Sequence, residues 1–313
     1  MLGTLVKSEQ AGYGGLCGMC VERTTGEILI NISDRGFYRS TDGAKTFKRL
    51  SETQPKGRTE TPGCFVIDPT GKSEVMLAAL VYGAPVSTCV DGIAWKPMNE
   101  KAAHVDWCAV DWTDSERKFV LALKHESGGM LIASRDGGIS FSEIGDGYGP
   151  GWVFNSTTAV VAQDKSEHRP KPVLLRTEDA GVTWNACGDY RPVGNASAQA
   201  LPRWHDGILF WVVEGKLIRS EDLGKTWETV CEIRAGHYGP VFGKTKDHMF
   251  VLTADGIVET NDGGASWLEA ISVPHELNGV GLTWLDYDPK EGRLYLMRMG
   301  SELYQLTPAR RTR

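Results

Sequence analysis

An eight-residue pattern recurs along the chain, and it limits the possible folds more than any other feature of the sequence. The pattern has Ser or Thr first, Asp third, Gly or Ala fifth, Ser or Thr seventh and Trp or Phe last. Five complete copies occupy residues 40–47, 134–141, 177–184, 220–227 and 260–267, and a degenerate copy at 88–95 has Val90 at the Asp position. The last residues of successive copies are 40 to 48 positions apart. This spacing is typical of one four-stranded blade of a β-propeller.

Each copy can form a tight hairpin turn from its own residues. The Asp carboxylate can accept hydrogen bonds from backbone N–H groups of the same turn, and the small fifth residue permits the bend. The aromatic residue that ends the copy would start the next strand and pack beneath the turn, a burial worth about 1.5–3 kcal/mol. The pattern therefore predicts structural rather than catalytic roles for Asp42, Asp136, Asp179, Asp222 and Asp262.

This pattern resembles the Asp-box repeat, also called the bacterial neuraminidase (BNR) repeat, of the sialidase-like superfamily. Proteins with this repeat include sialidases, xyloglucan-cleaving hydrolases, sortilin-type receptor domains and photosystem II assembly factors. The resemblance implies a β-propeller. It leaves the function open, because that group contains both enzymes and binding proteins.

Composition and spacing predict an all-β fold made of one ring of blades. The 313 residues include 37 Gly and 10 Trp, as expected for many short strands joined by tight turns. We expect a seven-bladed propeller, with a six-bladed ring as the alternative. An open sheet edge invites pairing with other chains, so we expect residues 1–7 to close the ring as the missing outer strand of the last blade. The predicted single domain covers residues 1–313, with blades at approximately 13–50, 61–98, 104–144, 151–187, 197–231, 238–271 and 279–308.

Charge and cysteine content argue against several classes of function. The net charge of −6 predicts no basic face for nucleic acid or an anionic membrane. The sequence contains no leader-like or membrane-spanning apolar run, so we expect a cytoplasmic protein; a secreted protein whose leader had been removed would look the same. The seven Cys residues are odd in number and mostly isolated, which favours free thiols over disulfides.

No metal and no cofactor are predicted. Cys17 and Cys20 form the only close Cys pair, and no second pair completes a zinc site. Residues three apart on a strand also face opposite sides of the sheet. The Gly-rich stretch 145–151 has no helix after it to bind a phosphate, and we interpret it as a flexible link between blades.

We expect the binding site on the face opposite the repeat turns. In each blade these turns join the third and fourth strands, whereas loops between the second and third strands and links between blades lie on the other face. Those loops and links contain five of the seven His residues. The predicted catalytic residues are His104, Asp106, His125, Glu126 and His237. The predicted substrate-binding residues are Arg58, Trp107, Tyr148, Trp152, His168, Arg169, Arg191 and Tyr238.

These residue types favour an enzyme that acts on a glycan. A glycosidase needs an acid and a carboxylate, or a His or Tyr in place of one, with aromatic side chains that hold sugar rings. A polysaccharide lyase needs a His or Tyr base, with Arg or Lys beside the carboxylate of a uronate. We therefore expect a glycoside hydrolase or a polysaccharide lyase, with an oligosaccharide or polysaccharide as its partner. The alternative is a non-catalytic propeller that binds a protein or a glycan, as assembly factors and sortilin-type domains imply.

The resemblance does not extend to the sialidase site. Sialidases hold the substrate carboxylate with three Arg residues, the first in an early Arg–aliphatic–Pro motif, and use a Tyr–Glu pair. The nearest matches here, Arg169-Pro170 and Arg191-Pro192, lack the aliphatic residue and lie in the middle of the chain. Hydrolysis of sialic acid is therefore not expected.

Overall fold

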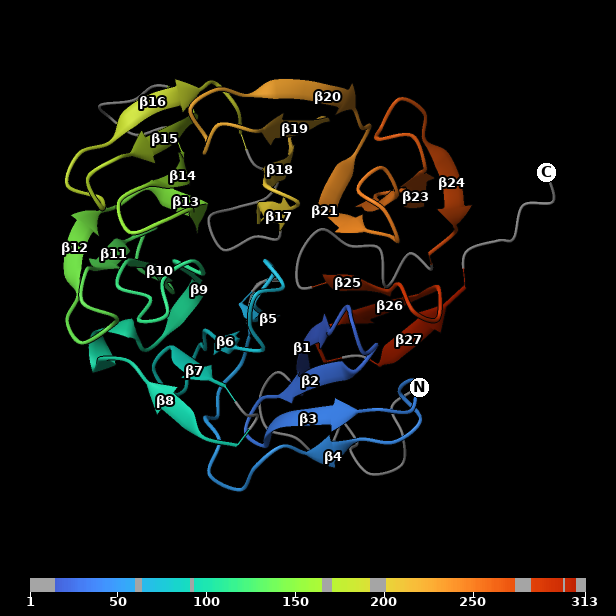
Figure 1. Cartoon of the computed structure of the whole chain (residues 1–313), viewed down its shortest axis with the longest axis horizontal. Coiled ribbons are helices and arrows are strands. Elements are labelled where there is room, and N and C mark those ends of the chain that lie inside the picture. The colour runs from blue at the N-terminus through green and yellow to red at the C-terminus, as the bar shows by residue number, and fades with distance from the viewer. Residues whose placement is uncertain are drawn as a thin grey trace.

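The fold is a ring of seven antiparallel sheets around a central axis (Figure 1). The computed structural model describes residues 15–59, 64–90, 93–164, 171–191, 201–273, 283–300 and 302–307. Within these residues six sheets have four strands and one has three. The first and last blades lie side by side in Figure 1, and strand β1 packs against strand β25. The protein is a seven-bladed β-propeller, as the repeat predicts.

Each blade is a meander in which every strand pairs with the next one along the chain. The first two blades contain β1 (Leu16–Val21), β2 (Ile28–Ile32), β3 (Gly36–Ser40), β4 (Lys48–Arg49), β5 (Phe65–Ile67), β6 (Met76–Ala78), β7 (Ser87–Cys89) and β8 (Trp95–Pro97). The third and fourth contain β9 (Val105–Val110), β10 (Val120–Lys124), β11 (Leu131–Ser134), β12 (Ser142–Gly145), β13 (Tyr148–Val153), β14 (Ala159–Gln163), β15 (Val173–Thr177) and β16 (Asn185–Gly188). The last three contain β17 (Arg203–His205), β18 (Ile208–Val213), β19 (Lys216–Ser220), β20 (Glu228–Glu232), β21 (Gly236–Phe242), β22 (Met249–Thr253), β23 (Gly256–Thr260), β24 (Leu268–Ile271), β25 (Thr283–Asp288), β26 (Arg293–Arg298) and β27 (Leu303–Leu306).

Most inner strands are buried along their length because each sheet is packed between two others. All five residues of β2 are buried, for example, whereas β12 at the rim has no buried residue. A strand covered on both faces needs no alternation of polar and apolar side chains. The largest fully buried side chains are those of Trp107, Trp211 and Trp284, which fill the space within and between blades.

The five complete repeat copies form turns with one shared set of hydrogen bonds; we call them the aspartate turns. Each joins the third and fourth strands of its blade. In the copy at 177–184, Oδ1 of Asp179 accepts from the Thr177 hydroxyl at 2.8 Å and from the Thr183 N–H at 2.8 Å, and Oδ2 accepts from the Thr183 hydroxyl at 2.6 Å. The Thr177 hydroxyl oxygen accepts from the Gly181 N–H at 2.9 Å. The other four turns repeat these bonds.

These bonds favour the ionised carboxylate. The hydroxyl and N–H of the seventh residue, followed by other donors of the turn, lower the pKa of Asp136, Asp179 and Asp262 to about 2. The same kinds of bond lower the pKa of Asp42, and they lower that of Asp222 against the opposing effect of burial. Since the carboxylates are occupied by their own turns, the geometry gives them a local structural task.

One inner strand differs from the sequence prediction. The Gly-rich stretch 145–151, expected to be a flexible link, continues into strand β13 with a register shift between Tyr148 and Gly151. A side chain at Gly151 would come within 2.4 Å of the Val160 carbonyl oxygen, so glycine permits this close pairing. In the fifth blade β17 begins at Arg203, and residues 197–200 of the predicted blade lie outside the described residues.

Other predictions for the ring fall beyond the described residues. The expected closing strand at residues 1–7 lies outside them, as does part of the degenerate copy at 88–95. A 3₁₀ helix, η2 (Glu100–Ala102), lies in the link between the second and third blades. In the part of the chain that the structure describes, no helix is long and apolar enough to cross a membrane.

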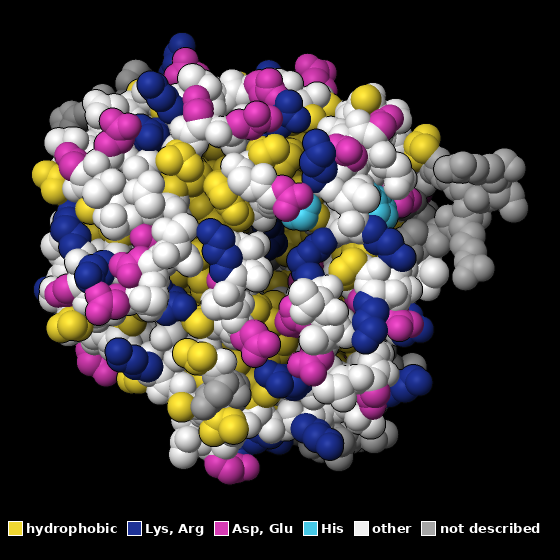
Figure 2. All heavy atoms as spheres, viewed as in Figure 1, with side chains coloured by type: hydrophobic (Ala, Val, Ile, Leu, Met, Phe, Trp, Pro, Cys, Tyr) yellow, Lys and Arg dark blue, Asp and Glu magenta, His cyan; other side chains and the backbone are white. Residues whose placement is uncertain are grey.

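Figure 2 shows how charge is distributed on one face of the ring. Lys and Arg side chains alternate with Asp and Glu side chains over the whole of this face, and hydrophobic side chains gather towards its middle. No extended patch of positive charge is present on it, so this face does not have the electrostatic character of a nucleic-acid surface.

Candidate active site

Four of the five predicted catalytic residues lie together between the second and third blades. His104 and Asp106 lie at the start of β9, and His125 and Glu126 follow β10. The backbone N–H of His125 donates to the His104 carbonyl oxygen at 2.9 Å, which ties the two segments together. All four belong to the face formed by the links between blades and the loops between second and third strands. We call this the link face and these four residues the histidine group.

Asp106 orients His125. Nδ1 of His125 lies 2.5 Å from Oδ1 of Asp106, and the two side chains are 11% and 5% exposed. Burial raises the pKa of Asp106, although the bond to His125 acts in the opposite direction. When Nδ1 donates to the carboxylate, Nε2 is left as the basic nitrogen of the ring. This nitrogen lies 3.6 Å from Oε1 of Glu126, whose side chain is 65% exposed.

His104 is held in the other tautomer. The backbone N–H of Tyr82 donates to Nδ1 of His104 at 3.2 Å, so the neutral ring carries its proton on Nε2. Burial, followed by the neighbouring His125, lowers the pKa of His104. The ring centroids of the two histidines are 4.9 Å apart. The group thus pairs a basic nitrogen on one imidazole with an N–H donor on the other.

Tyr82 is a site residue that the predicted set lacks. Its ring centroid lies 4.7 Å from that of His104 and 5.4 Å from that of His125, and its side chain is 53% exposed. Tyr82, His104 and Glu126 all have left-handed backbone conformations, with φ of 51°, 58° and 51°. Such conformations are costly outside glycine and gather at functional sites. A loop tyrosine has no sequence signal that distinguishes it, because neither its φ nor its contacts can be derived from the local residues.

Arg58 lies beneath this tyrosine and not on the surface. Its guanidinium carbon is 5.2 Å from the centroid of the Tyr82 ring, and the residue is 6% exposed. The backbones of Arg58 and Val81 exchange hydrogen bonds of 2.9 and 2.8 Å. The Arg58 side chain therefore supports the Tyr82 ring, and direct contact with a ligand would require Tyr82 to move.

Most of the other predicted residues are strand residues that pack inside the propeller. Trp107 is 1% exposed within the core around β9 and β10, and Tyr148 is 9% exposed, with its ring 6.2 Å from that of Trp184. The half-buried ring of Trp152 stacks on Trp204 at 6.1 Å. These residues lie in β9 and β13, and their register directs them into the packing between blades.

The last predicted residues lie apart from the histidine group. His237, in β21, is 1% exposed, its pKa is lowered by burial, and Nδ1 lies 3.4 Å from the Ala235 carbonyl oxygen. Its neighbour Tyr238 is buried and accepts a hydrogen bond from Arg203 at 2.5 Å. Arg191 is 53% exposed and lies 3.8 Å from Asp164. His168 and Arg169 lie outside the described residues.

The histidine group fits proton transfer better than metal binding. Ligand atoms of His104, His125 and Glu126 lie within 4.8 Å of one another, as a three-ligand metal site would require. A metal on Nε2 of His104 would require the proton on Nδ1, where it would face the N–H of Tyr82. A metal on Nδ1 would displace that N–H. The existing hydrogen bonds therefore oppose a metal on His104 and place the protons of the two rings on different nitrogens.

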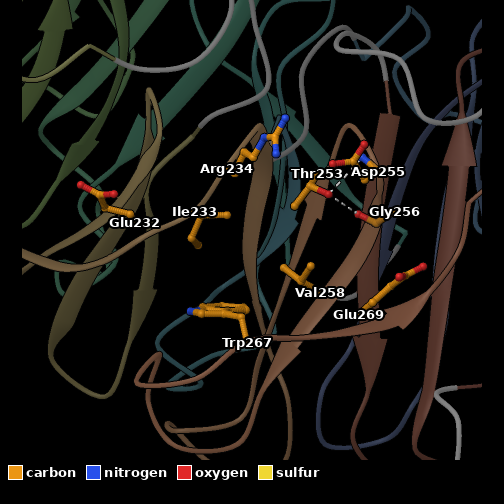
Figure 3. A pocket seen from close by; sticks show the side chains of 9 residues that line it. All are labelled: Glu232, Ile233, Arg234, Thr253, Asp255, Gly256, Val258, Trp267 and Glu269. Atoms are coloured by element: carbon orange, nitrogen blue, oxygen red, sulfur yellow. Dashed lines mark hydrogen bonds between the residues drawn. The ribbon is translucent and has the colours of Figure 1, made fainter.

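Two hollows lie elsewhere, on the outer parts of the blades. One of about 250 Å³ lies between the fifth and sixth blades, where Trp267 and Val258 form its wall and Glu232 and Glu269 lie on opposite sides (Figure 3). Another of about 310 Å³ is lined by residues of β3 and β4 and by Ile93. Neither includes a residue of the histidine group.

Comparison with known proteins shows the fold. No protein-family model matches the chain, and no curated protein matches it significantly. YCF48 bound to D1 peptide is similar with a TM-score of 0.54 and 12% identity, over 95% of this chain and 94% of that one. The extracellular domain of BT4673 from B. thetaiotaomicron, described as a hybrid two component system, gives 0.56 and 10% identity over 96% of this chain.

The partial coverage of some of these neighbours and their low sequence identity limit what can be inferred from them about this protein. This chain covers only 39% of the BT4673 chain. The GH74 xyloglucanase from Xanthomonas campestris gives a TM-score of 0.38 and 13% identity, over 94% of this chain and 65% of that one. Identities this low show the architecture alone.

Proposed function

We propose that the chain is a carbohydrate-active enzyme whose active centre is the histidine group on the link face. The observation that carries this proposal is the bond between Asp106 and His125, because it leaves Nε2 of His125 as a base beside the exposed Glu126. A carboxylate behind an imidazole fixes its tautomer and stabilises the imidazolium that forms when the ring accepts a proton. General bases of this kind accelerate reactions by about 10²–10⁴-fold.

The same base serves both reactions that the sequence analysis left open. In hydrolysis, His125 accepts a proton from water as the water oxygen bonds to the anomeric carbon, the glycosidic C–O bond breaks, and the leaving sugar oxygen takes a proton from a second water molecule. In elimination, His125 accepts the proton next to a uronate carboxylate, the glycosidic C–O bond breaks as the new C=C bond forms, and the leaving oxygen takes a proton from the His125 imidazolium. Both reactions need a base that can reach the substrate, and Nε2 of His125 lies beside the exposed Glu126.

Turnover of a panel of polysaccharides tests this proposal. Reducing-end release would report hydrolysis, and the ultraviolet absorbance of unsaturated uronates would report elimination. On the polymer that is cleaved, we expect Asp106→Asn and His125→Ala to lower kcat by about 10²–10⁴-fold. His205→Gln is the control, since His205 lies in the β17–β18 region of another blade. A cleaved polymer on which Asp106→Asn has wild-type kcat would contradict the proposal.

A second candidate is a propeller that binds a protein or glycan without turnover. The 53% exposure of the Tyr82 ring favours it, because exposed aromatic side chains commonly anchor partners, and neither of the two hollows described above includes the histidine group. The complex of YCF48 with D1 peptide is an example of a propeller that binds a peptide. Under this alternative a ligand would bind without being cleaved, and Asp106→Asn would leave its affinity unchanged.

We also infer that the aspartate turns are Asp-box turns. All five place the carboxylate, the first hydroxyl and the seventh residue in the same bonding pattern, which is what a conserved task in turn formation would require. With a structural role for these turns, the functional site is sought on the link face.

A further inference from the structure

Tyr82 is exposed, yet its backbone is firmly held. The residue has a φ of 51°, a conformation that a tyrosine rarely adopts. The segment around it is tied to the preceding link by three backbone hydrogen bonds, two between Arg58 and Val81 and one from the Ala84 N–H to the Lys56 carbonyl oxygen at 2.9 Å. A side chain at the intervening Gly83 would come within 2.1 Å of that oxygen, so the two segments are in close contact. An exposed aromatic ring on a rigid support is pre-organised to bind a ligand.

The polar groups beside the ring define what kind of ligand fits. Nε2–H of His104 is a neutral donor, and its ring lies against Tyr82. A sugar ring has a C–H face that packs on an aromatic ring, and it carries hydroxyl oxygens that accept hydrogen bonds. Tyr82 and His104 together offer one partner for each of these features.

Charge then distinguishes between classes of sugar. The carboxylates of Asp106 and Glu126 lie beside the two imidazoles. Two of the nearby cations are engaged within the protein: Arg58 lies buried beneath Tyr82, and Nζ of Lys124 donates to the carbonyl oxygens of Ala103 at 2.5 Å and Lys101 at 3.3 Å. A carboxylate on the ligand would meet two negative groups here, a repulsion that opposes binding.

From this geometry we propose that the histidine group binds an uncharged sugar ring, stacked on Tyr82 and hydrogen-bonded to His104. The inference rests on the proposed function for the choice of a glycan, and it narrows that function to neutral polymers. Elimination requires a carboxylate on the sugar, so the reaction that remains is hydrolysis. Tyr82 becomes the residue that determines which sugars bind.

Binding can be measured separately from catalysis in the full-length His125→Ala protein. Titration calorimetry with neutral hexose oligosaccharides should show binding that Tyr82→Ala weakens about 10-fold, whereas Tyr82→Phe keeps the ring and changes affinity by less than about 2-fold. Uronate oligosaccharides should bind more weakly than neutral ones. Val182→Ala is the matched control, because Val182 is 69% exposed on an aspartate turn. Unfolding midpoints would confirm that each variant is folded.

The outcomes separate this inference from the function on which it rests. If neutral oligosaccharides bind and the loss in Tyr82→Ala appears, but no polymer is cleaved by the wild-type protein, the inference stands and the enzymatic proposal fails. If a polymer is cleaved in a way that depends on His125, but Tyr82→Ala leaves KM and affinity unchanged, the inference is wrong. Tighter binding of uronates than of neutral sugars, or no binding of any sugar, would also overturn it.

Discussion

At the scale of single residues, the two histidines of the link face differ because different partners hold their Nδ1 atoms. A carboxylate holds that of His125 and a backbone N–H holds that of His104. The first partner accepts a proton from Nδ1 of His125, whereas the second is incompatible with a proton on Nδ1 of His104. The two rings, whose centroids are 4.9 Å apart, therefore carry their protons on different nitrogens.

This difference predicts the titration of His104. Burial and the adjacent His125 lower its pKa, so we expect the ring to remain neutral, with its proton on Nε2, at pH values below the usual 6.5. Nitrogen-15 NMR of labelled histidine would report both the tautomer and the titration midpoint, with a His104→Gln variant for assignment. The urea-unfolded chain provides the reference, because its histidines should titrate near 6.5. A midpoint at or above the reference value would show that the Tyr82 N–H does not control this ring.

The sequence predicted part of this site for a clear physical reason. Loop position was enough to select His104, His125 and Glu126, because a meander sends those loops to one face. It was not enough for Trp107 or Tyr238, which lie within strands, where a shift of one residue turns a side chain from solvent to core. Tyr82 depends on contacts with distant segments, which a local pattern cannot show.

At the scale of elements, the aspartate turn is a unit whose parts differ in burial. Thr177 is fully buried, and its hydroxyl oxygen is the acceptor for the Gly181 N–H. Thr183 lies at the exposed end and bonds the same carboxylate. The turn was readily predicted because all of its hydrogen bonds lie within eight residues.

Replacing each threonine by valine tests this division. Valine has the shape of threonine and lacks its hydroxyl, so Thr177→Val leaves the buried Gly181 N–H without its acceptor, at a cost of about 1–3 kcal/mol in the free energy of unfolding. Thr183→Val is the matched control and should cost less, because water can replace the lost bond at an exposed position. Urea unfolding gives both values. Equal losses of unfolding free energy in the two variants would show that the burial of a hydroxyl group does not determine how much its hydrogen bonds contribute to stability.

At the scale of the whole molecule, the aspartate turns and the histidine group lie on different faces of the ring. Because every blade is a meander, the aspartate turns gather on one face and the histidine group lies on the other. The blade count needed more than the repeat, because the seventh blade, predicted at residues 279–308, contains no copy of it. The division between the two faces could be predicted from the repeat alone. The choice of one inter-blade position among seven for the histidine group could not, because nothing in the repeat differs at the third blade.

The repetition of one turn also predicts how the molecule responds to acid. The pKa values of Asp136, Asp179 and Asp262 are about 2 in the folded protein, below the ordinary 3.8, so the unfolded chain binds more protons between these two values. Their stabilising effect is therefore fully present above pH 4 and is lost as the pH falls towards 2. Asp42 and Asp222 add to it, whereas Asp106 and Asp286, whose pKa values are raised by burial, act in the opposite direction.

The five lowered carboxyls of the aspartate turns, together with those of Glu22, Asp114 and Glu178, outnumber the two raised ones among the described residues, so we expect the free energy of unfolding to fall steeply between pH 4 and pH 2. Thermal or urea unfolding at several pH values in this range would measure the slope, which is proportional to the number of protons taken up on unfolding. Asp179→Asn removes one of the five titrating groups and should give a shallower slope, whereas Asp146→Asn should leave the slope at its wild-type value, since Asp146 lies outside the aspartate turns. A wild-type stability that is constant between pH 4 and pH 2 would show that the bonds within the turns form equally well in the unfolded chain.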